Sequence, residues 1–206
     1  MSHDSGENAA MPDAPNLSDA DEKGCHLALL IVDMINGFDF PDASALLQRA
    51  AAAAGPIAAL AQRARAAEVP VVYVNDNFGR WRSDFRGVIA HVRAHTAGAA
   101  IADTLAPHER DYFVLKPRHS GFLGTSLEVL LQHLQARCLI LTGIAGDSCV
   151  LFTAMDAHMR GYRLLAPADC IASADDANNR RALDLLRESM RADISPSPTI
   201  DVARRE

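Results

Sequence analysis

The chain has 206 residues, of which 49% are hydrophobic and 22% charged, and its formal net charge is -6. This length and composition predict one globular domain, and the acidic balance argues against a nucleic-acid surface, which needs a basic stripe. No apolar run is long enough to cross a membrane. Residues 1–25 are polar and acidic and lack the apolar core of a signal peptide, so we expect a flexible N-terminal arm and a cytoplasmic protein.

Aliphatic runs alternate with stretches of helical periodicity along the rest of the chain. The predicted strands cover residues 26–34, 70–76, 111–117, 137–143 and 162–169, with a candidate edge strand at 192–196. The predicted helices cover residues 43–68, 88–95, 125–135, 148–161 and 173–190. Within the first helix, Gly55 and Pro56 indicate either a kink or a new helix start. In the third helix, Thr125 and Glu128 have the spacing of a capping box.

Strands that alternate with helices predict an α/β protein with a three-layer Rossmann-like fold, a mostly parallel sheet with helices on both faces. The expected segments are an arm at 1–25, the domain at 26–195 and a polar C-terminal tail at 196–206. In such a sheet all strand carboxyl ends lie at one edge, where ligands bind. Asp33, Asp76 and Lys116 each end a predicted strand, and the loop before Cys149 follows another. The sequence therefore predicts a site at this edge.

Cys149 falls where a predicted strand passes into a predicted helix, within TGIAGDSCVLFTA. A thiol becomes a nucleophile when its pKa falls below the ordinary value of about 8.5, through a helix N-terminus or a cation such as Lys116. Asp33 is the candidate base for the thiol proton, and the amides before Cys149 are candidate oxyanion donors. The alternative is that Cys149 is a small buried hydrophobic residue. The remaining cysteines, without C-x-x-C spacing, are expected to be inert free thiols: Cys25, Cys138 and Cys170.

Three segments carry a resemblance to a known family: ALLIVDMINGF, VLKPRHSGFLGTSL and LILTGIAGDSCVLFTAMDAHMRGYRLLAPADCIAS. In this order they resemble the isochorismatase-like cysteine hydrolases, the group that includes nicotinamidases and N-carbamoylsarcosine amidases. The resemblance extends over residues 26–190. It implies that Asp33, Lys116 and Cys149 are the catalytic residues.

The same resemblance implies hydrolysis of a carbon–nitrogen bond in a small amide or carbamoyl compound. Asp33 would accept the thiol proton, and Cys149 would form a covalent thioester with the substrate. Asp33 would then protonate the leaving amine and later activate the water that hydrolyses the thioester. The resemblance also implies an oxyanion hole made by the amides of Ala145 and Cys149, and a cis peptide bond between Ile144 and Ala145.

Nicotinamidases of this family bind a divalent metal through an aspartate and histidines after the second strand. The corresponding stretch, residues 74–85, contains Asp76 but no histidine. We therefore expect no metal and no required cofactor. His91 and His95 are one helical turn apart but lack a nearby third ligand, so we expect them on a helix surface.

Phe38, Asn77 and Trp81 are expected to line the substrate pocket. Two other functions remain open: a vinyl ether hydrolase of the isochorismatase type, for which Asp33 and Lys116 suffice, and a non-catalytic binding member of the family. Because relatives are commonly dimers or tetramers, we expect a homodimer or homotetramer. The expected partner is a small-molecule substrate, with no nucleic acid and no membrane.

Overall fold

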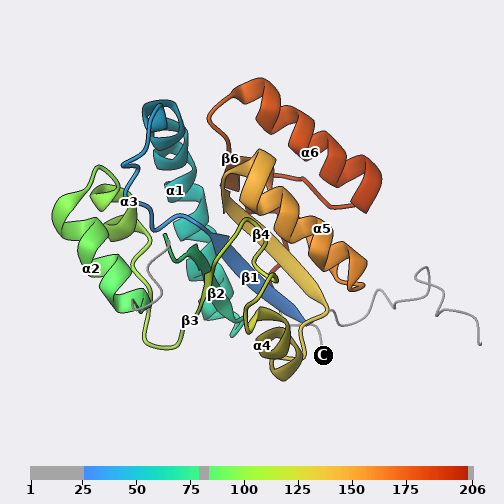
Figure 1. The fold of residues 1–206 in the computed structure, drawn as a ribbon. Helices are drawn as coiled ribbons and strands as arrows, with labels where there is room; N and C mark the ends of the chain where they lie inside the picture. Colours follow the sequence, from blue (N-terminus) through green and yellow to red (C-terminus); the bar gives the residue numbers. More distant parts are fainter. Residues whose placement is uncertain (1–25, 79–83, 204–206) are drawn as a thin grey trace, which may run out of the picture.

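A parallel sheet runs through the centre of the computed structural model, which describes residues 26–78 and 84–203 (Figure 1). The strands are β1 (Leu27–Val32), β2 (Val71–Asp76), β3 (Tyr112–Lys116), β4 (Cys138–Ile144), β5 (Arg163–Leu165) and β6 (Ile171–Ala172). Their order is β3-β2-β1-β4-β5, and β6 pairs with the end of β4. All of these pairings are parallel, as the alternation of strands and helices predicts.

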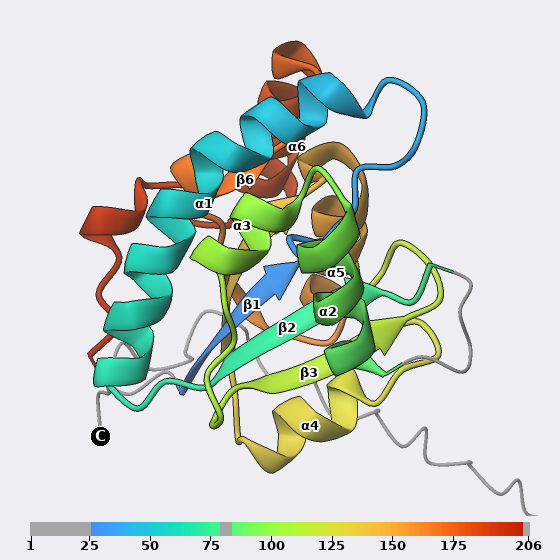
Figure 2. The same cartoon turned by 90° about the vertical axis from the view of Figure 1, so that its left-hand side faces the viewer.

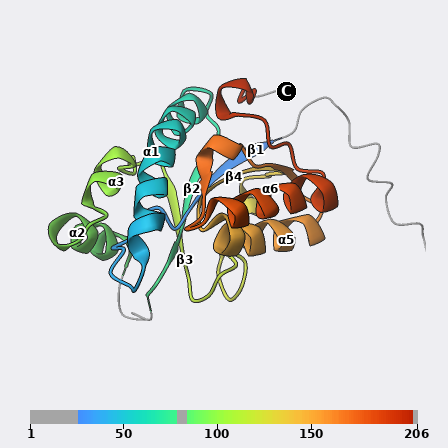
Figure 3. The same ribbon diagram turned by 90° about the horizontal axis from the view of Figure 1, so that it is seen from above.

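Helices cover both faces of the sheet and complete three layers (Figures 1 and 3). One face carries α1 (Ala43–Ala66), α2 (Phe85–His95) and α3 (Ala99–Thr104), which stand in front of the strands in Figure 2. The other face carries α4 (Leu127–His133), α5 (Leu151–Met159) and α6 (Asp176–Met190). The predicted α/β fold with helices on both faces is confirmed.

The aliphatic run of β1 shows why the sheet lies in the middle. Successive side chains of a strand point to opposite faces. Leu29 and Ile31 accordingly pack in the apolar cluster under α1, while Leu30 and Val32 pack in the cluster under α5 and α6. All four are fully buried, so both faces of the strand need apolar residues.

Several local predictions differ from the structure. Pro56 lies inside one continuous helix, α1, so Gly55 and Pro56 do not start a new helix. The capping box at Thr125 is wrong: its hydroxyl accepts from the Leu127 amide and donates to the Gly121 carbonyl, and α4 begins only at Leu127. The candidate edge strand at 192–196 is reduced to a single bridge between Leu165 and Asp193.

The C-terminal segment that the structure describes lies against α1. Ile200 and Val202 are buried, and the Arg63 guanidinium donates to the backbone carbonyls of Ser197 and Ile200. This segment, which the sequence predicts to be a polar tail, therefore packs against the domain. None of the helices in the described parts of the chain combines the length and apolar character that crossing a membrane requires.

The cysteines divide into two kinds. Cys149 and Cys170 carry free thiols, as expected. Cys138 is disulfide-bonded, so the expectation of a free thiol is wrong at this position. Cys25 lies outside the described residues. Local spacing gave no sign of this bond, because the two halves of a disulfide need proximity in space and not a short separation in sequence.

Candidate active site

The topology of the sheet brings the predicted catalytic residues to one edge. The chain runs outward from β1 to β3 and then returns to place β4 beside β1, so the strand order reverses between β1 and β4. Asp33 follows β1, and Cys149 follows β4, at the carboxyl side of this reversal. Ligands of open α/β sheets bind in the crevice at such a point. Lys116 ends β3, in register with Asp76 at the end of β2.

The Lys116 ammonium is the centre of the site. Its Nζ lies 2.7 Å from Asp33 Oδ2 and 3.4 Å from Cys149 Sγ. A second carboxylate oxygen, Asp76 Oδ2, lies 3.7 Å away. Lys116 is fully buried and Asp33 is 5% exposed, whereas Cys149 is only half-buried. The structure therefore brings Asp33, Lys116 and Cys149 together, with the sulfur on the more accessible side.

The Asp33 carboxylate is held by the backbone on its other oxygen. Oδ1 accepts from the Asp76 amide at 2.7 Å. Asp33 has φ of 51°, a left-handed conformation that non-glycine residues seldom adopt and that clusters at functional sites. The following loop is fixed by Asn75, a fully buried side chain that donates to the Ile35 carbonyl at 2.7 Å. These contacts leave the carboxylate little freedom to turn away from Lys116.

Cys149 lies in a single turn of π-helix, η1 (Gly146–Val150), which continues into α5. Such turns are frequent at functional sites. The Ile144–Ala145 peptide bond is cis, at the position that the family resemblance implied. The Ala145 carbonyl accepts from the amides of Ser148 and Val150, at 3.0 and 3.1 Å. The Cys149 amide, expected to bind an oxyanion, belongs to this turn, and Ala145, whose amide is the other expected donor, directly precedes it.

Gly146 permits a close approach between this turn and the segment before α6. A Cβ at position 146 would lie 2.7 Å from Ile171 Cγ2 and 3.0 Å from Ser173 Oγ, so any side chain here would force its neighbours to move. The Ser173 hydroxyl in turn accepts from the Asp147 amide at 3.0 Å and donates to Asn179 Oδ1. The turn that carries Cys149 is therefore held against the segment before α6 by close packing and hydrogen bonds.

Burial dominates the electrostatics of the site. It raises the pKa of Asp33, although the Lys116 charge opposes the shift. Burial, and then the negative charge of Asp33, raise the pKa of Cys149 to about 12. For Lys116, burial lowers the pKa, but the charges of Asp33 and Cys149 raise it by more, so the net direction is upward. Lys116 lowers the pKa of the thiol, as expected, but burial and the Asp33 charge outweigh it, so the expected net lowering is wrong for the resting site.

The raised pKa of Cys149 determines how this thiol can react. Cys149 rests as a neutral thiol, so a base must remove its proton when it attacks a substrate. The Asp33 carboxylate hydrogen-bonds to Cys149, and its raised pKa makes it a stronger base than an ordinary carboxylate. Lys116 contacts both groups, so its positive charge stabilises whichever of them is ionised.

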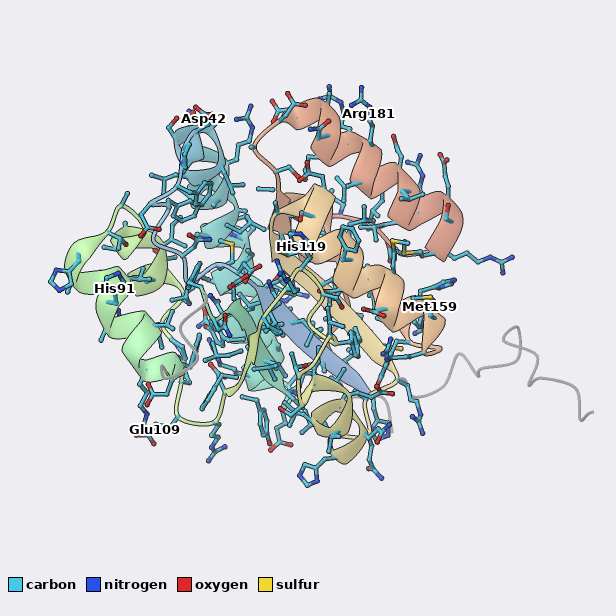
Figure 4. The ribbon with its side chains drawn as sticks, in the orientation of Figure 1. Asp42, His91, Glu109, His119, Met159 and Arg181 are labelled. Atoms are coloured by element: carbon cyan, nitrogen blue, oxygen red, sulfur yellow. The ribbon has the colours of Figure 1, made fainter. Side chains whose placement is uncertain are left out.

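His119 is a site residue that no sequence pattern singles out. It lies at the middle of the molecule in Figure 4, in the loop after β3, three residues beyond Lys116. Its Nδ1 is 3.4 Å from Ser148 Oγ and 3.9 Å from Cys149 Sγ. Its ring lies against Phe152, with centroids 5.6 Å apart. Its place within the family-like segment that contains Lys116 was the only available signal.

The structure describes two of the three predicted pocket residues. Phe38 and Asn77 are both 7% exposed, and the Asn77 amide donates to the Lys116 carbonyl at 3.0 Å. Trp81 lies outside the described residues. Neighbours of Phe38 and Asn77 along the chain contribute to a cavity of about 230 Å³, which is lined by Gly37, Asp39, Phe78, Val88, His91 and Val92.

The two histidines of α2 remain apart from any metal-binding cluster. The ring centroids of His91 and His95 lie 5.8 Å apart. Across residues 26–78 and 84–203, no group of three or more histidine, cysteine, aspartate or glutamate side chains is arranged to hold a metal ion. Asp76 instead faces Lys116.

Comparison with known proteins places the chain in one family. Residues 27–196 match the Isochorismatase domain. The chain is 42% identical over 173 residues to the uncharacterized isochorismatase family protein YaaI of Bacillus subtilis (strain 168), covering 84% of this chain and 95% of YaaI. It is 31% identical over 122 residues to the N-carbamoylsarcosine amidase of an Arthrobacter species, covering 53% of this chain and 46% of that protein.

A solved structure agrees with these sequence matches. The crystal structure of N-carbamoylsarcosine amidase from Thermoplasma acidophilum superposes with a TM-score of 0.67 and 29% identity, covering 85% of this chain and 98% of that one. The chain therefore belongs to the isochorismatase family.

Proposed function

We propose that this protein is a cysteine hydrolase that cleaves a carbon–nitrogen bond in a small amide or carbamoyl compound through a thioester on Cys149. The observation that carries the proposal is the contact of one buried ammonium, Lys116 Nζ, with both Asp33 Oδ2 and Cys149 Sγ. A carboxylate, a cation and a thiol joined in this way at the crevice of an α/β sheet supply a base and a nucleophile together. The amidase names among the relatives support the same chemistry.

The first half of the reaction forms the thioester. Asp33 accepts the proton of the thiol as Sγ attacks the carbonyl carbon, and Lys116 stabilises the negative charge that develops on sulfur. The amides of Ala145 and Cys149 donate to the carbonyl oxygen as it becomes an oxyanion. Collapse of this intermediate breaks the carbon–nitrogen bond. The leaving amine takes the proton that Asp33 received, which returns Asp33 to its carboxylate form beside Lys116.

Intact-mass detection tests the proposal directly. The protein is incubated with a library of small amides and carbamoyl compounds, the reaction is quenched in acid, and the intact protein is analysed by mass spectrometry. We expect an adduct on Cys149 whose added mass equals the acyl half of the substrate. The adduct and the hydrolysis should both disappear in Cys149→Ala.

Cys170→Ala is the matched control, because Cys170 is the other free thiol among the described residues and is fully buried. This variant should keep both the adduct and the hydrolysis. Hydrolysis of these amides that survives in Cys149→Ala would overturn the thioester, whereas cleavage of a vinyl ether that survives in the same variant would favour a vinyl ether hydrolase that uses Asp33 and Lys116 alone. A complete absence of adduct and hydrolysis across the library would overturn the amidase assignment itself.

A further inference from the structure

The helix α5 is apolar on two faces, although only one of them packs against the sheet. Its inner face is buried, with Ala154 and Ala157 fully inaccessible to solvent. Its outer face carries Phe152, Met155 and Met159, which are 48%, 41% and 73% exposed. Spacings of three and four residues place these side chains in one stripe along the helix. The outer face of a surface helix ordinarily carries charged and polar residues instead.

The helix α6 follows the ordinary pattern. It lies beside α5 over the same face of the sheet (Figure 3). Its outer side carries exposed charged residues, among them Arg181, Asp184 and Arg187. The apolar stripe of α5 therefore does not follow from its place in the fold.

Two further apolar residues border this stripe. Leu123, in the loop after β3, is 56% exposed, and Val129, on α4, is 68% exposed. The chain next to each of them contacts the end of α5, because the Arg160 guanidinium lies over the Phe122 ring and pairs with Glu128. We define the α5 patch as these two residues together with the three of the stripe: Leu123, Val129, Phe152, Met155 and Met159.

The area of the α5 patch corresponds to one protein–protein interface. A large apolar side chain buries about 150–250 Å², so five that are each about half exposed leave roughly 500 Å² in contact with water. A stable interface of standard size buries about 800 Å² on each partner, of which about 55–65% is non-polar. The patch therefore supplies the apolar part of one such interface.

The charged residues beside the patch are already paired within the chain. Arg160 binds Asp156 at 2.8 Å and Glu128 at 3.1 Å. The Asp156 carboxylate also accepts a hydrogen bond from the Ser120 hydroxyl. A partner can therefore cover this rim without leaving a charge buried and unpaired, which is the main cost of covering ionised groups. Two identical copies satisfy this condition, since neither needs a counter-charge from the other.

Within this chain, residues 1–25 are unsuited to cover the patch. They contain one leucine and no valine, isoleucine or aromatic residue, and most of their residues are polar, small or acidic. We propose that the occupant is a second copy of the chain, with α5 of each copy packed against α5 of the other across a two-fold axis. The same patch then serves both partners. The spacing of the stripe allows the side chains of the two helices to interdigitate.

This interface adjoins the candidate active site. The Phe152 ring, part of the α5 patch, lies 5.6 Å between centroids from His119, whose Nδ1 is 3.9 Å from Cys149 Sγ. A second copy seated on the patch covers the outer side of this pair of rings and so forms part of the wall around the sulfur.

Sedimentation velocity of the full chain over a wide range of concentration tests the proposal. We expect the wild type to be a dimer at micromolar concentration. Met155→Glu and Met159→Glu each place an unpaired carboxylate in the interface, so we expect either to raise the dimer dissociation constant about 30-fold or more. Phe40→Glu is the matched control, because Phe40 is 44% exposed and precedes α1, on the opposite face of the sheet. This control should dimerise as the wild type does.

Cysteine cross-linking locates the contact independently of these variants. In a Cys149→Ala background, Met155→Cys should give a covalent dimer with a short bismaleimide reagent, whereas Phe40→Cys should not. Because Met155 lies in the middle of the stripe, its two copies lie close to the two-fold axis.

Two results would overturn the inference. One is a wild type that stays monomeric at every concentration, which would leave a different protein as the occupant of the patch. The other is a wild-type dimer that both glutamate variants, shown to be folded by circular dichroism, form equally well and that Met155→Cys does not cross-link. Such a dimer would use another surface. Neither measurement requires a substrate, so the outcome does not depend on the proposed hydrolase activity.

Discussion

Replacing Lys116 by methionine tests how the site is held together. Methionine has a similar length and no charge, so the substitution removes the ammonium and leaves the packing volume nearly unchanged. Asp33 then loses the partner 2.7 Å from its Oδ2 while remaining 5% exposed. Removing one partner of a buried ion pair costs about 3–5 kcal/mol, because the remaining charge is buried without compensation. This is a large part of a domain stability of about 5–15 kcal/mol.

Urea denaturation at pH 7 measures this loss as a lower transition midpoint. In a thermal scan, the same loss corresponds to a decrease in Tm of about 6–20 °C for a domain of this size. Adding Asp33→Asn to Lys116→Met removes the uncompensated carboxylate. We therefore expect the double variant to be more stable than Lys116→Met alone, with a coupling between the two sites. All of these variants should lack activity.

The pH dependence of Lys116→Met has a definite sign. Burial raises the folded-state pKa of Asp33, and without Lys116 nothing of comparable strength opposes the shift. A carboxyl group with a raised folded pKa destabilises the protein above that pKa, and this penalty is lost as the pH falls through it. The deficit of Lys116→Met relative to the wild type should shrink on acidification. A deficit below 1 kcal/mol, or a double variant no more stable than Lys116→Met, would refute this account of the site.

Two further predictions concern Cys149 and the loop beside it. Because its pKa is raised from 9.0 to about 12, Cys149 at pH 7 carries less thiolate than an ordinary thiol, an effect partly offset by the higher nucleophilicity of a more basic thiolate. It should therefore react with iodoacetamide about 30-fold more slowly than an ordinary thiol, and a rate that levels off below pH 8 would contradict this. Thr153→Val removes the hydroxyl between Gly121 and Cys149 and should cost about 1–3 kcal/mol in urea denaturation, with lower turnover. Thr104→Val, which removes an exposed bond within a helix, should change stability by less than about 0.5 kcal/mol, and equal losses in the two variants would argue against the bridging role.

The strands and the residues at their ends were predictable from the sequence. An aliphatic run such as that of β1 is typical of a strand buried on both faces, and the polar residue that ends it must lie at the carboxyl edge of a parallel sheet. The same logic located Lys116, and the family-like segments connected it with Asp33 and Cys149. Caps were predicted less well, as Thr125 shows, because a local pattern competes there with tertiary contacts.

The protonation of the site was decided by the tertiary structure alone. A residue pattern shows that Cys149 begins a helix and that Lys116 ends a strand, but it carries no information on how much water the fold removes from each. Burial and the Asp33 charge, brought from a strand more than a hundred residues away, reverse the expected direction of the thiol pKa. The approach of His119 to the sulfur likewise depends on hydrogen bonds between a loop and a helix. The sequence determined which groups meet at the sheet edge, and only the packed structure determined which of them hold a proton there.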